Sequence, residues 1–421
     1  MSVETTYPLT IGQLSIFRDA EKLPADRLWE ANLPFAWDLR QECSVEDVWT
    51  ALGALAMRHE SLRTNYVLGA DGLPRQYLVA DDAEAVLARL DRDIASIADY
   101  AAVEEDKYQQ AIDVYAELPW RVCVFTDADG VPKRLLVIAH HITADGAASL
   151  ILQDDLHALL SGAELPPPAG QPRTMALNQQ GAGAPRLRAA ERYWRRTLEA
   201  APRRPALIPP GGAMIGATLH TGIPLELGHE GADKMDASLA SAVLAAYYDA
   251  LRAATGASEI LLIPMSANRF DAGVASVVTS LNQWVPLLLE FDGGESIGEL
   301  SRVVHWKAFN AFKNGTCDPD AIVRIRDEFF EQADPPVSPG YNFNAILAPP
   351  GFASGVRRVP SETEFYVPAR ATGPGFYLIA RGIETIDLIV RVNRPEFDQP
   401  KVAAFLASMQ ESLLTVAGLD A

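Results

Sequence analysis

The sequence predicts an α/β protein made of two layered lobes. Patterns typical of strands alternate with patterns typical of helices in both halves of the chain, which favours sheets covered by helices. A segment rich in Pro, Gly, Ala and Gln, residues 161–183, is the best candidate for a linker between the halves. With 421 residues, 48% of them hydrophobic, the chain can bury two substantial cores. We therefore expect an N-terminal lobe over residues 1–178 and a C-terminal lobe over residues 179–421.

The first half predicts a capped helix and then a hairpin. Ser44 is a good N-cap, and Asp47 stands three residues later, where its carboxylate can bond back to the cap. Apolar residues that include Val48 and Leu52 give this helix one face for the core. Residues 120–125 and 134–139 are β-prone runs on either side of an Asp-Ala-Asp-Gly segment, which is a pattern typical of two antiparallel strands.

The second of these strands ends at a polar heptad. Residues 135–139 form a short apolar run that should be buried on both faces, and residues 147–160 carry apolar side chains near helical spacing. The heptad between them, residues 140–146, is His-His-Ile-Thr-Ala-Asp-Gly. It therefore lies in a strand-to-helix loop, where a rigid scaffold can hold side chains toward a cavity.

The two histidines of the heptad are expected to have different roles. Adjacent residues in an extended segment point to opposite sides, so one of His140 and His141 should face a cavity as a base while the other packs inward. Asp145 is close enough to brace the turn or to pair with an arginine. Zinc needs several ligands that converge on one point, and no second cluster of such ligands is apparent, so we expect no metal. The alternative interpretation gives the pair no functional role: one histidine packs in the core and the other lies on the surface.

The second half begins with an arginine-rich segment. Residues 186–204 contain seven arginines around Tyr193 and Trp194 and have helical character. One interpretation is a solvated helix face on which Glu191 and Glu199 make spaced ion pairs. The other is a docking patch for an acidic partner. Residues 237–251 then predict an apolar helix, and residues 260–263 predict a strand.

The heptad matches the HHxxxDG signature of the condensation domains of nonribosomal peptide synthetases. The chain resembles these domains and related acyltransferases of the chloramphenicol acetyltransferase-like superfamily. Residues 58–66 resemble the family's RHExLRTxF element, and residues 8–13 are similar to its opening motif. Residues 262–269 resemble a strand that ends in Asn-Arg, and a strand at 386–392 with a closing helix also fits. The resemblance covers nearly the whole chain.

Some motifs depart from the family pattern. The arginine that usually follows Gln13 closely is absent, and Ala147 stands where a tryptophan often follows the heptad. Residues 280–286 represent the family's Phe-Val-Asn-Thr-Leu-Pro stretch only loosely, and Trp284 in them is bulky enough to reshape a substrate tunnel. These departures leave the fold prediction intact and the substrate open.

The resemblance implies two chloramphenicol acetyltransferase-like lobes in a V-shaped pseudo-dimer with a central tunnel. His141 is then the expected catalytic base at the middle of the tunnel, and Gly146 leaves room for substrate and offers its backbone N–H near the oxyanion. His140 is expected to be structural. Asp145 is expected to pair with Arg63 and hold the loop. It is not expected to act as a second base, because an ion-paired carboxylate is a poor proton acceptor. The expected tunnel residues are Asn268, Arg269 and Trp284.

The resemblance also implies a reaction. The phosphopantetheine arm of an acyl or peptidyl carrier protein would present an acyl or aminoacyl thioester, and transfer to an amine would form an amide in natural-product biosynthesis, with no cofactor bound to the enzyme. Two alternatives stay open: ester formation on a hydroxyl acceptor, and a condensation-like platform that recruits partners without catalysis. Since no adenylation-like or carrier-like segment is apparent, we expect a free-standing protein that meets carriers in trans.

Composition excludes several other classes of protein. The net charge of -19 and pI near 4.8 disfavour binding to nucleic acid or anionic membranes. No apolar run is long enough to span a bilayer and no leader is apparent, so a cytoplasmic location is expected. Three cysteines without close spacing suggest neither disulfides nor a thiol metal site, and Cys317 is a remote candidate for a nucleophile. The absence of a Gly-x-Ser-x-Gly elbow argues against a serine hydrolase.

Overall fold

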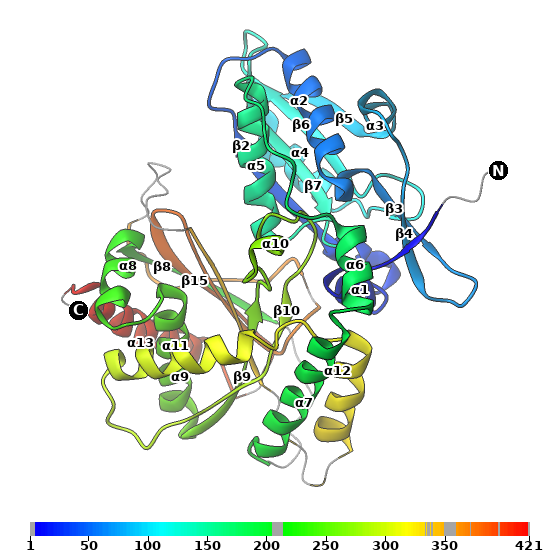
Figure 1. Cartoon of the computed structure of the whole chain (residues 1–421). Coiled ribbons are helices and arrows are strands. Elements are labelled where there is room, and N and C mark those ends of the chain that lie inside the picture. The colour runs from blue at the N-terminus through cyan, green and yellow to red at the C-terminus, as the bar shows by residue number, and fades with distance from the viewer. Residues whose placement is uncertain are drawn as a thin grey trace. The chain divides into compact units, whose positions relative to one another are not determined.

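The computed structural model describes residues 5–203, 214–332, 334, 337, 340–348, 359–370, 372–394 and 396–419. They form two compact α/β units (Figure 1), which confirms the prediction of two α/β lobes. The first unit contains Met1–Leu187 and Ala267–Gln283, and the second contains Arg188–Ser266 and Trp284–Ala421. The predicted division at 178/179 differs from this partition in two ways. The boundary falls inside helix α7 (Ala184–Ala200), and a segment from the second half folds with the first unit.

The first unit is built on a four-stranded sheet with the strand order β2-β7-β6-β5. β2 (Asn32–Asp38), β7 (Pro132–His140) and β6 (Trp120–Thr126) are antiparallel neighbours, whereas β5 (Asp91–Ser96) runs parallel to β6. The predicted hairpin is therefore present as β6 and β7. A second sheet has the order β1-β4-β3, formed by Tyr7–Pro8, Pro74–Leu78 and Thr64–Leu68.

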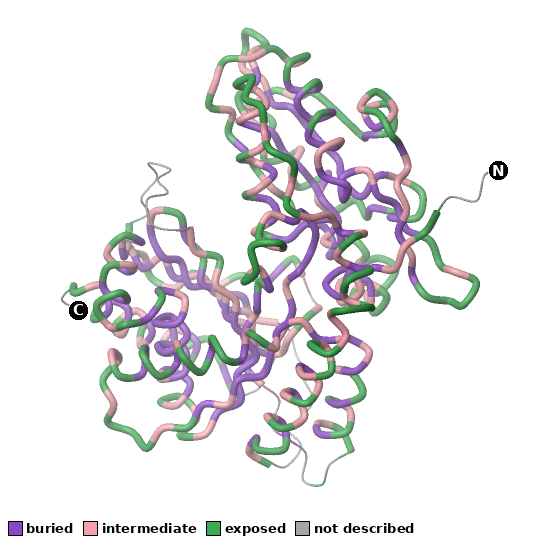
Figure 2. Tube along the Cα trace, viewed as in Figure 1, coloured by how far each residue is buried: buried purple, intermediate pink, exposed green. Residues whose placement is uncertain are grey.

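Helices cover both faces of the four-stranded sheet. On one face, α2 (Val45–Arg58) and α5 (Gly146–Leu160) share a core with Leu135 and Val137. On the other face, α1 (Ile11–Ala20) and α4 (Tyr100–Tyr108) share a core with Leu136 and Ile138. β7 is thus buried on both faces, as predicted (Figure 2). The capping box predicted at Ser44 is present. The remaining helical segments of this unit are α3 (Ala83–Arg89), α6 (Pro172–Gln180), α10 (Ala272–Ala275) and the 3-10 turns Ala25–Ala31, Glu60–Arg63 and Ile97–Asp99.

The predicted linker, residues 161–183, belongs to the folded first unit. It contains α6, from which Arg173 makes a two-bond ion pair with Glu60 at 2.5 and 2.9 Å. Arg58 and His59 at the end of α2 both bond to the carboxylate of Asp155 on α5 at 2.7 Å. Polar residues of the 58–66 element therefore tie α2 to α5 and α6.

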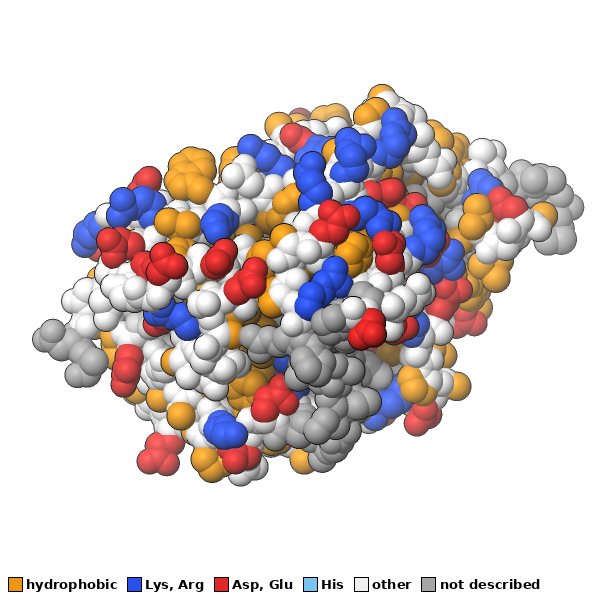
Figure 3. All heavy atoms as spheres, turned by 90° about the horizontal axis from the view of Figure 1, so that it is seen from below, with side chains coloured by type: hydrophobic (Ala, Val, Ile, Leu, Met, Phe, Trp, Pro, Cys, Tyr) orange, Lys and Arg blue, Asp and Glu red, His pale blue; other side chains and the backbone are white. Residues whose placement is uncertain are grey.

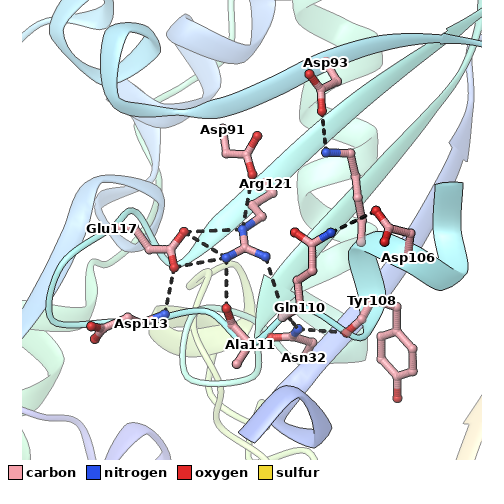
Figure 4. A network of polar contacts seen from close by, with 11 residues as sticks. Asn32, Asp91, Asp93, Asp106, Tyr108, Gln110, Ala111, Asp113, Glu117 and Arg121 are labelled. Atoms are coloured by element: carbon pink, nitrogen blue, oxygen red, sulfur yellow. Dashed lines mark hydrogen bonds and ion pairs between the residues drawn. The ribbon is translucent and has the colours of Figure 1, made fainter.

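A polar network lies beside the strand end that carries the heptad (Figure 4). Arg121 on β6 donates to the carboxylate of Glu117 and to two backbone carbonyls of segment 108–111. Asn32, which stands opposite His140 in the β2–β7 register, donates to two carbonyls of the same segment at 2.8 and 3.0 Å. The network fixes this segment against the sheet and so stiffens the end of the strand from which the heptad begins.

The second unit is built on a mixed sheet with the order β10-β9-β12-β14-β15-β8-β13, and β11 also pairs with β9. β12 runs parallel to β9 and β14, whereas β14, β15 and β8 are antiparallel neighbours. In chain order, β8 to β15 are Ile215–Pro224, Glu259–Ser266, Gln283–Trp284, Leu287–Glu290, Tyr341–Leu347, Glu364–Tyr366, Phe376–Gly382 and Thr385–Val392.

Helices cover both faces of this sheet as well. α8 (Leu225–Lys234), α9 (Leu239–Thr255), α11 (Ile297–Phe312) and α13 (Gln399–Ala417) share the large core on one face. α7 and α12 (Pro319–Arg326), followed by the π-helical turn Asp327–Glu331, pack on Leu261 and Ile263 on the other face. The predicted helix at 237–251, the strands at 260–263 and 386–392 and the closing helix are all present. None of the described helices is long and apolar enough to cross a membrane.

Candidate active site

The heptad lies where the sequence places it, between β7 and α5. β7 ends at His140 and α5 begins at Gly146, so the loop between them is only a few residues long. Asp145 is the N-cap of α5, and its Oδ1 accepts a hydrogen bond from the backbone N–H of Ala148 at 2.8 Å. The start of the helix therefore fixes the end of the heptad.

The first histidine of the heptad, His140, is buried and hydrogen-bonded within the loop. Only 6% of it is exposed, and its Nδ1 accepts a hydrogen bond from the backbone N–H of Ile142 at 3.2 Å. Burial, with a smaller contribution from the neighbouring His141, lowers the pKa of His140 to about 3. His140 is therefore neutral at physiological pH, and an acceptor at Nδ1 places its ring proton on Nε2.

The second histidine of the heptad, His141, contacts two oxygen atoms through Nδ1. It is half-buried, and its Nδ1 lies 3.1 Å from the carbonyl oxygen of Ala144 and 3.4 Å from Oγ of Ser280. A carbonyl oxygen can only accept, so we assign the ring proton to Nδ1, which leaves the lone pair on Nε2. Its backbone N–H donates at 2.7 Å to the carbonyl of Ala31, the residue that directly precedes β2. The two histidines thus differ in burial and in tautomer, as expected for adjacent residues that face opposite sides.

Asp145 is a buried ion-pair partner, but its partner is Arg269 and not Arg63. The Nη2 of Arg269 lies 2.8 Å from Oδ1 of Asp145, which is only 2% exposed. The predicted pair with Arg63 is wrong: Arg63 donates to Ala80 O at 2.9 Å and lies 4.0 Å from Asp81. The reason is local, because the carbonyl of Arg63 accepts from the chain just after β4 and its side chain follows that segment.

Segment 267–283 completes the site from the second half of the chain. The backbone N–H of Leu281 donates to Oδ2 of Asp145 at 2.9 Å. Asn268, at a positive φ of 54°, donates to Leu281 O at 2.7 Å, and Arg269 donates to the carbonyls of Val277 and Thr279 at 2.6 and 3.0 Å. Asn268 and Arg269, predicted as tunnel residues, therefore shape the loop that brings Ser280 to His141. Sequence reasoning missed Ser280.

The opening motif supports the same segment. A Cβ on Gly12 would lie 2.2 Å from the backbone oxygen of Ser280, so only glycine permits this close approach of α1 to the segment. Thr10 and Gln13 form a capping box that starts α1. The Nε2 of Gln13 also lies 3.4 Å from the hydroxyl of Tyr66, a fully buried phenol whose pKa is raised by burial. The glutamine of the motif is therefore a buried structural residue.

Gly146 and Trp284 lie in different units. Gly146 is exposed, and a Cβ at this position would meet nothing within 4 Å in the described part of the chain. Its backbone N–H belongs to the first turn of α5, where a helix offers no internal acceptor. Trp284 is half-buried in the second unit, where its ring makes an edge contact with Tyr377 at 5.4 Å between centroids. A role for Trp284 in a tunnel stays a prediction.

A metal site and a cysteine nucleophile are the two other kinds of site that the sequence raises. The described residues contain no group of three or more His, Cys, Asp or Glu side chains that could hold a metal ion. Cys317 is buried in the second unit, and burial raises the pKa of its thiol strongly, which disfavours the thiolate that a nucleophile needs. Cys123 is also buried, with a pKa raised to about 11, chiefly by burial.

The arginine-rich segment is α7, and its arginines divide into two groups. Arg195 pairs with Glu328 at 2.7 Å and Arg186 pairs with Asp271 at 2.7 Å, so neither uses the predicted partners Glu191 and Glu199. Arg188, Arg192 and Arg196 are exposed, stand four residues apart on one helix face, and form no ion pair within the described residues. Arg204 lies outside the described residues.

The family model of the condensation domain matches residues 3–332 of this chain. The chain belongs to the condensation-domain family. Its heptad, its two α/β units and the position of the heptad between β7 and α5 now have a common explanation in this membership.

Two curated relatives show the extent of the similarity. The isonitrile lipopeptide synthase of Mycobacterium tuberculosis is 35% identical over 160 residues, which is 36% of this chain and 6% of that protein. Surfactin synthase subunit 1 of Bacillus subtilis is 24% identical over 322 residues, which is 73% of this chain and 9% of that protein. The chain thus spans a small part of the length of these relatives.

Solved structures confirm the fold. The condensation domain from the monacolin K polyketide synthase MokA superposes with a TM-score of 0.77 at 18% identity, covering 99% of this chain and 98% of that one. The SgcC5 protein from Streptomyces globisporus gives a TM-score of 0.70 at 21% identity, covering 98% of both chains. At these identities the likeness establishes the fold alone.

The first prediction concerns the pair of Asp145 and Arg269. Removing one partner strands a buried charge, which typically costs about 3 to 5 kcal/mol. We expect Arg269→Met and Asp145→Asn each to lower the free energy of unfolding, measured by urea titration, and the double variant to lose less than the sum. Arg63→Met is the matched control, because its effects should add to those of Asp145→Asn. The assignment of Arg269 as the partner of Asp145 would be wrong if the effects of Arg269→Met and Asp145→Asn on the unfolding free energy added, and those of Arg63→Met and Asp145→Asn did not.

The second prediction concerns pH. Because the pKa of His140 falls from 6.5 in the unfolded chain to about 3 in the fold, only the unfolded chain binds this proton between those values. Stability should therefore fall as the pH drops below 6.5, by up to about 1.4 kcal/mol per pH unit from this group. In His140→Asn, whose Oδ1 can accept from Ile142 N–H, the slope of unfolding free energy against pH should be smaller. An equal slope in both proteins would contradict the role of His140.

Proposed function

We propose that this protein is a condensation enzyme that transfers an acyl or aminoacyl group from a carrier-bound thioester to an amine, forming an amide in natural-product biosynthesis. The observation that supports the proposal best is the position and tautomer of the His141 ring. A histidine at a loop end, with Nδ1 held by a backbone carbonyl and the lone pair on Nε2, is equipped to take a proton from an amine. The test is a transfer assay with carrier-loaded donor and matched amine and hydroxyl acceptors, with products identified by mass spectrometry.

In the proposed reaction the amine nitrogen attacks the thioester carbonyl. The C–N bond forms, the C–S bond breaks and the arm leaves as a thiol. His141 Nε2 accepts the proton lost by the amine and returns it to the thiolate, so no proton is gained or lost overall. Since a thioester is already activated, positioning of the acceptor and removal of this proton are the main tasks of the protein.

Gly146 has a separate part in this proposal. It is exposed and has open space where a side chain would stand, so a substrate can approach the backbone closely. The N–H groups in the first turn of α5 carry the positive end of the helix dipole, which suits the oxyanion that develops on the attacked carbonyl. Asp145 is occupied with Arg269 and Leu281 and takes no proton in this scheme.

The proposed partner is an acyl or peptidyl carrier protein whose phosphopantetheine arm holds the donor. The exposed face of Arg188, Arg192 and Arg196 on α7 supports such a partner, because a basic helix face on a chain of net charge -19 favours encounter with an acidic surface. Ester formation on a hydroxyl acceptor uses the same base and stays an alternative. A recruitment platform without catalysis is the second alternative, and the transfer assay separates it from both enzymes.

The third prediction is that replacing His141 removes most of the transfer activity. His141→Asn keeps a donor that can reach Ala144 O but supplies no base, so we expect turnover to fall about a hundredfold to ten-thousandfold with little change in melting temperature. Ser280→Ala is the control, because it leaves the contact of the ring with Ala144 O in place. It removes the longer 3.4 Å contact to the ring and the hydrogen bond from Ser280 to Oδ1 of Asn282. Near wild-type turnover in folded His141→Asn would show that positioning alone supplies the rate.

The fourth prediction uses Gly146. Since a Cβ there meets nothing within the described part of the chain, Gly146→Ala should leave the melting temperature unchanged. If substrate passes close to this backbone, kcat/KM should fall about tenfold to a hundredfold. Gly298→Ala is a matched control at the first turn of α11, where a Cβ would make an ordinary contact with Met235 at 3.6 Å. Full activity in Gly146→Ala would place the substrate elsewhere.

The fifth prediction tests the carrier. Arg188→Glu with Arg192→Glu should raise KM for a carrier-loaded donor about tenfold and leave kcat and the reaction of the matching free thioester unchanged. The wild-type reaction with the carrier should also weaken as salt rises, because exposed charges are screened over about 10 Å at 0.1 M ionic strength. Arg89→Glu with Lys234→Glu, two other exposed cations, controls for net charge. Equal efficiency of both donors would favour a small-molecule acyltransferase.

A further inference from the structure

A groove of about 370 Å³ lies on the second unit, separate from the heptad. Three elements of that unit line it: α7, β11 and α11. The lining residues are Tyr193, Arg196, Thr197, Ala200, Leu287, Leu288, Lys307 and Asn310.

The groove follows the edge of the sheet. β11 pairs with β9 over four residues, and no other strand among the described residues pairs with its outer side. α11 packs on one face of the sheet and α7 on the other, so the outer side of β11 lies between the two helices. Leu287 belongs to the core on the α11 face and Leu288 packs with the core on the α7 face. An open strand edge of this kind is a template for one more strand.

The lining of the groove combines apolar and cationic side chains. The apolar part of the lining is made by the leucines of β11 and by Tyr193, whose hydroxyl donates to Pro286 O at 2.9 Å. Arg196 on one wall and Lys307 on the other are exposed and form no ion pair within the described residues. No carboxylate lines the groove, although the chain as a whole has a net charge of -19. The site therefore favours a ligand with carboxylates and some apolar side chains.

α11 carries two exposed apolar side chains close in the sequence to Lys307. Trp306 and Val303 on α11 are 52% and 41% exposed, within one helical turn of Lys307. Aromatic side chains are enriched at protein interfaces, so an exposed tryptophan on this helix is compatible with a partner surface. Figure 3 views the molecule from below, the side on which Figure 1 draws α7 and α12, and shows Lys and Arg side chains there beside exposed hydrophobic ones.

We propose that the β11 edge is a docking site for an extended acidic segment of a partner protein, which adds to β11 as a further strand and places its carboxylates against Arg196 and Lys307. Main-chain hydrogen bonds to β11 supply affinity, and side chains alternate between the two walls. The four residues of β11 span about 13 Å, enough for a short linear segment. The site does not depend on the transfer reaction, so the proposal and the proposed function can fail independently.

Charges beside a strand edge also have a purely structural use, since they keep edges from pairing with other copies. The two interpretations differ in one respect. Edge protection works with charges of either sign, whereas recognition of an acidic segment needs cations. Reversing both charges therefore separates them.

The experiment is fluorescence anisotropy on the full chain with a labelled peptide of about eight residues in which pairs of Glu alternate with pairs of Val, so that carboxylates face both walls. We expect saturable binding that weakens with salt, and a loss of about tenfold or more in affinity in Arg196→Glu with Lys307→Glu. The control pair Arg89→Glu and Lys234→Glu should change affinity less than about twofold, since surface charges away from the site contribute little. A peptide with Lys in place of Glu should not bind.

A second measurement tests the added strand. The same acidic peptide with N-methyl groups on alternate amides keeps its charges but loses main-chain donors, so it should bind about tenfold or more weakly when the methyl groups fall on the edge that meets β11. Hydrogen exchange at residues 287–290 should slow when the unmodified peptide binds. No saturable binding, equal losses in the two charge-reversed pairs, or equal binding of every N-methylated peptide would each overturn the proposal.

Discussion

The buried carboxylate of Asp145 is the group on which the site depends. It accepts hydrogen bonds from the backbone N–H of Ala148, the guanidinium of Arg269 and the backbone N–H of Leu281. A charge buried this deeply is tolerated only when such partners compensate its lost hydration. Because the partners come from α5 and from segment 267–283, satisfying one carboxylate fixes the start of the helix and the loop beside the heptad at the same time.

This use of Asp145 explains how His141 is oriented. Asp145 bonds to Arg269 and Leu281, whereas the Nδ1 of His141 faces the carbonyl of Ala144. Ala144 directly precedes the helix cap, so the bonds that fix Asp145 also fix the carbonyl that selects the tautomer of His141. The spacing of the heptad from its second histidine to its aspartate therefore has a physical meaning: cap and orienting carbonyl are neighbours in one short loop.

Local patterns in the sequence predicted most of the fold, and long-range pairing escaped them. Apolar runs and a capping box were sufficient for β6, β7 and α2, because these depend on neighbours within a few residues. The partner of Asp145 lies 124 residues away, and no local pattern indicates it. The resemblance to the family implied Arg63 instead, and this pairing is wrong for this chain. The Pro- and Gly-rich composition of 161–183 suggested a linker, but the segment contains α6 and belongs to the first unit. Composition carries no information on the contacts of Arg173 with Glu60 that hold it there.

The same limit applies to the charges of α7. Composition identified a cluster of arginines but could not assign their partners, because Glu328 and Asp271 are distant in the chain. Once Arg195 and Arg186 are neutralised, the remaining positive charge follows the four-residue spacing of Arg188, Arg192 and Arg196 along one face of the helix. An exposed cation attracts a partner only to the extent that no nearer carboxylate already screens it. The positive charge that α7 can offer a partner is therefore smaller than its number of arginines suggests, because carboxylates of neighbouring segments pair with some of them.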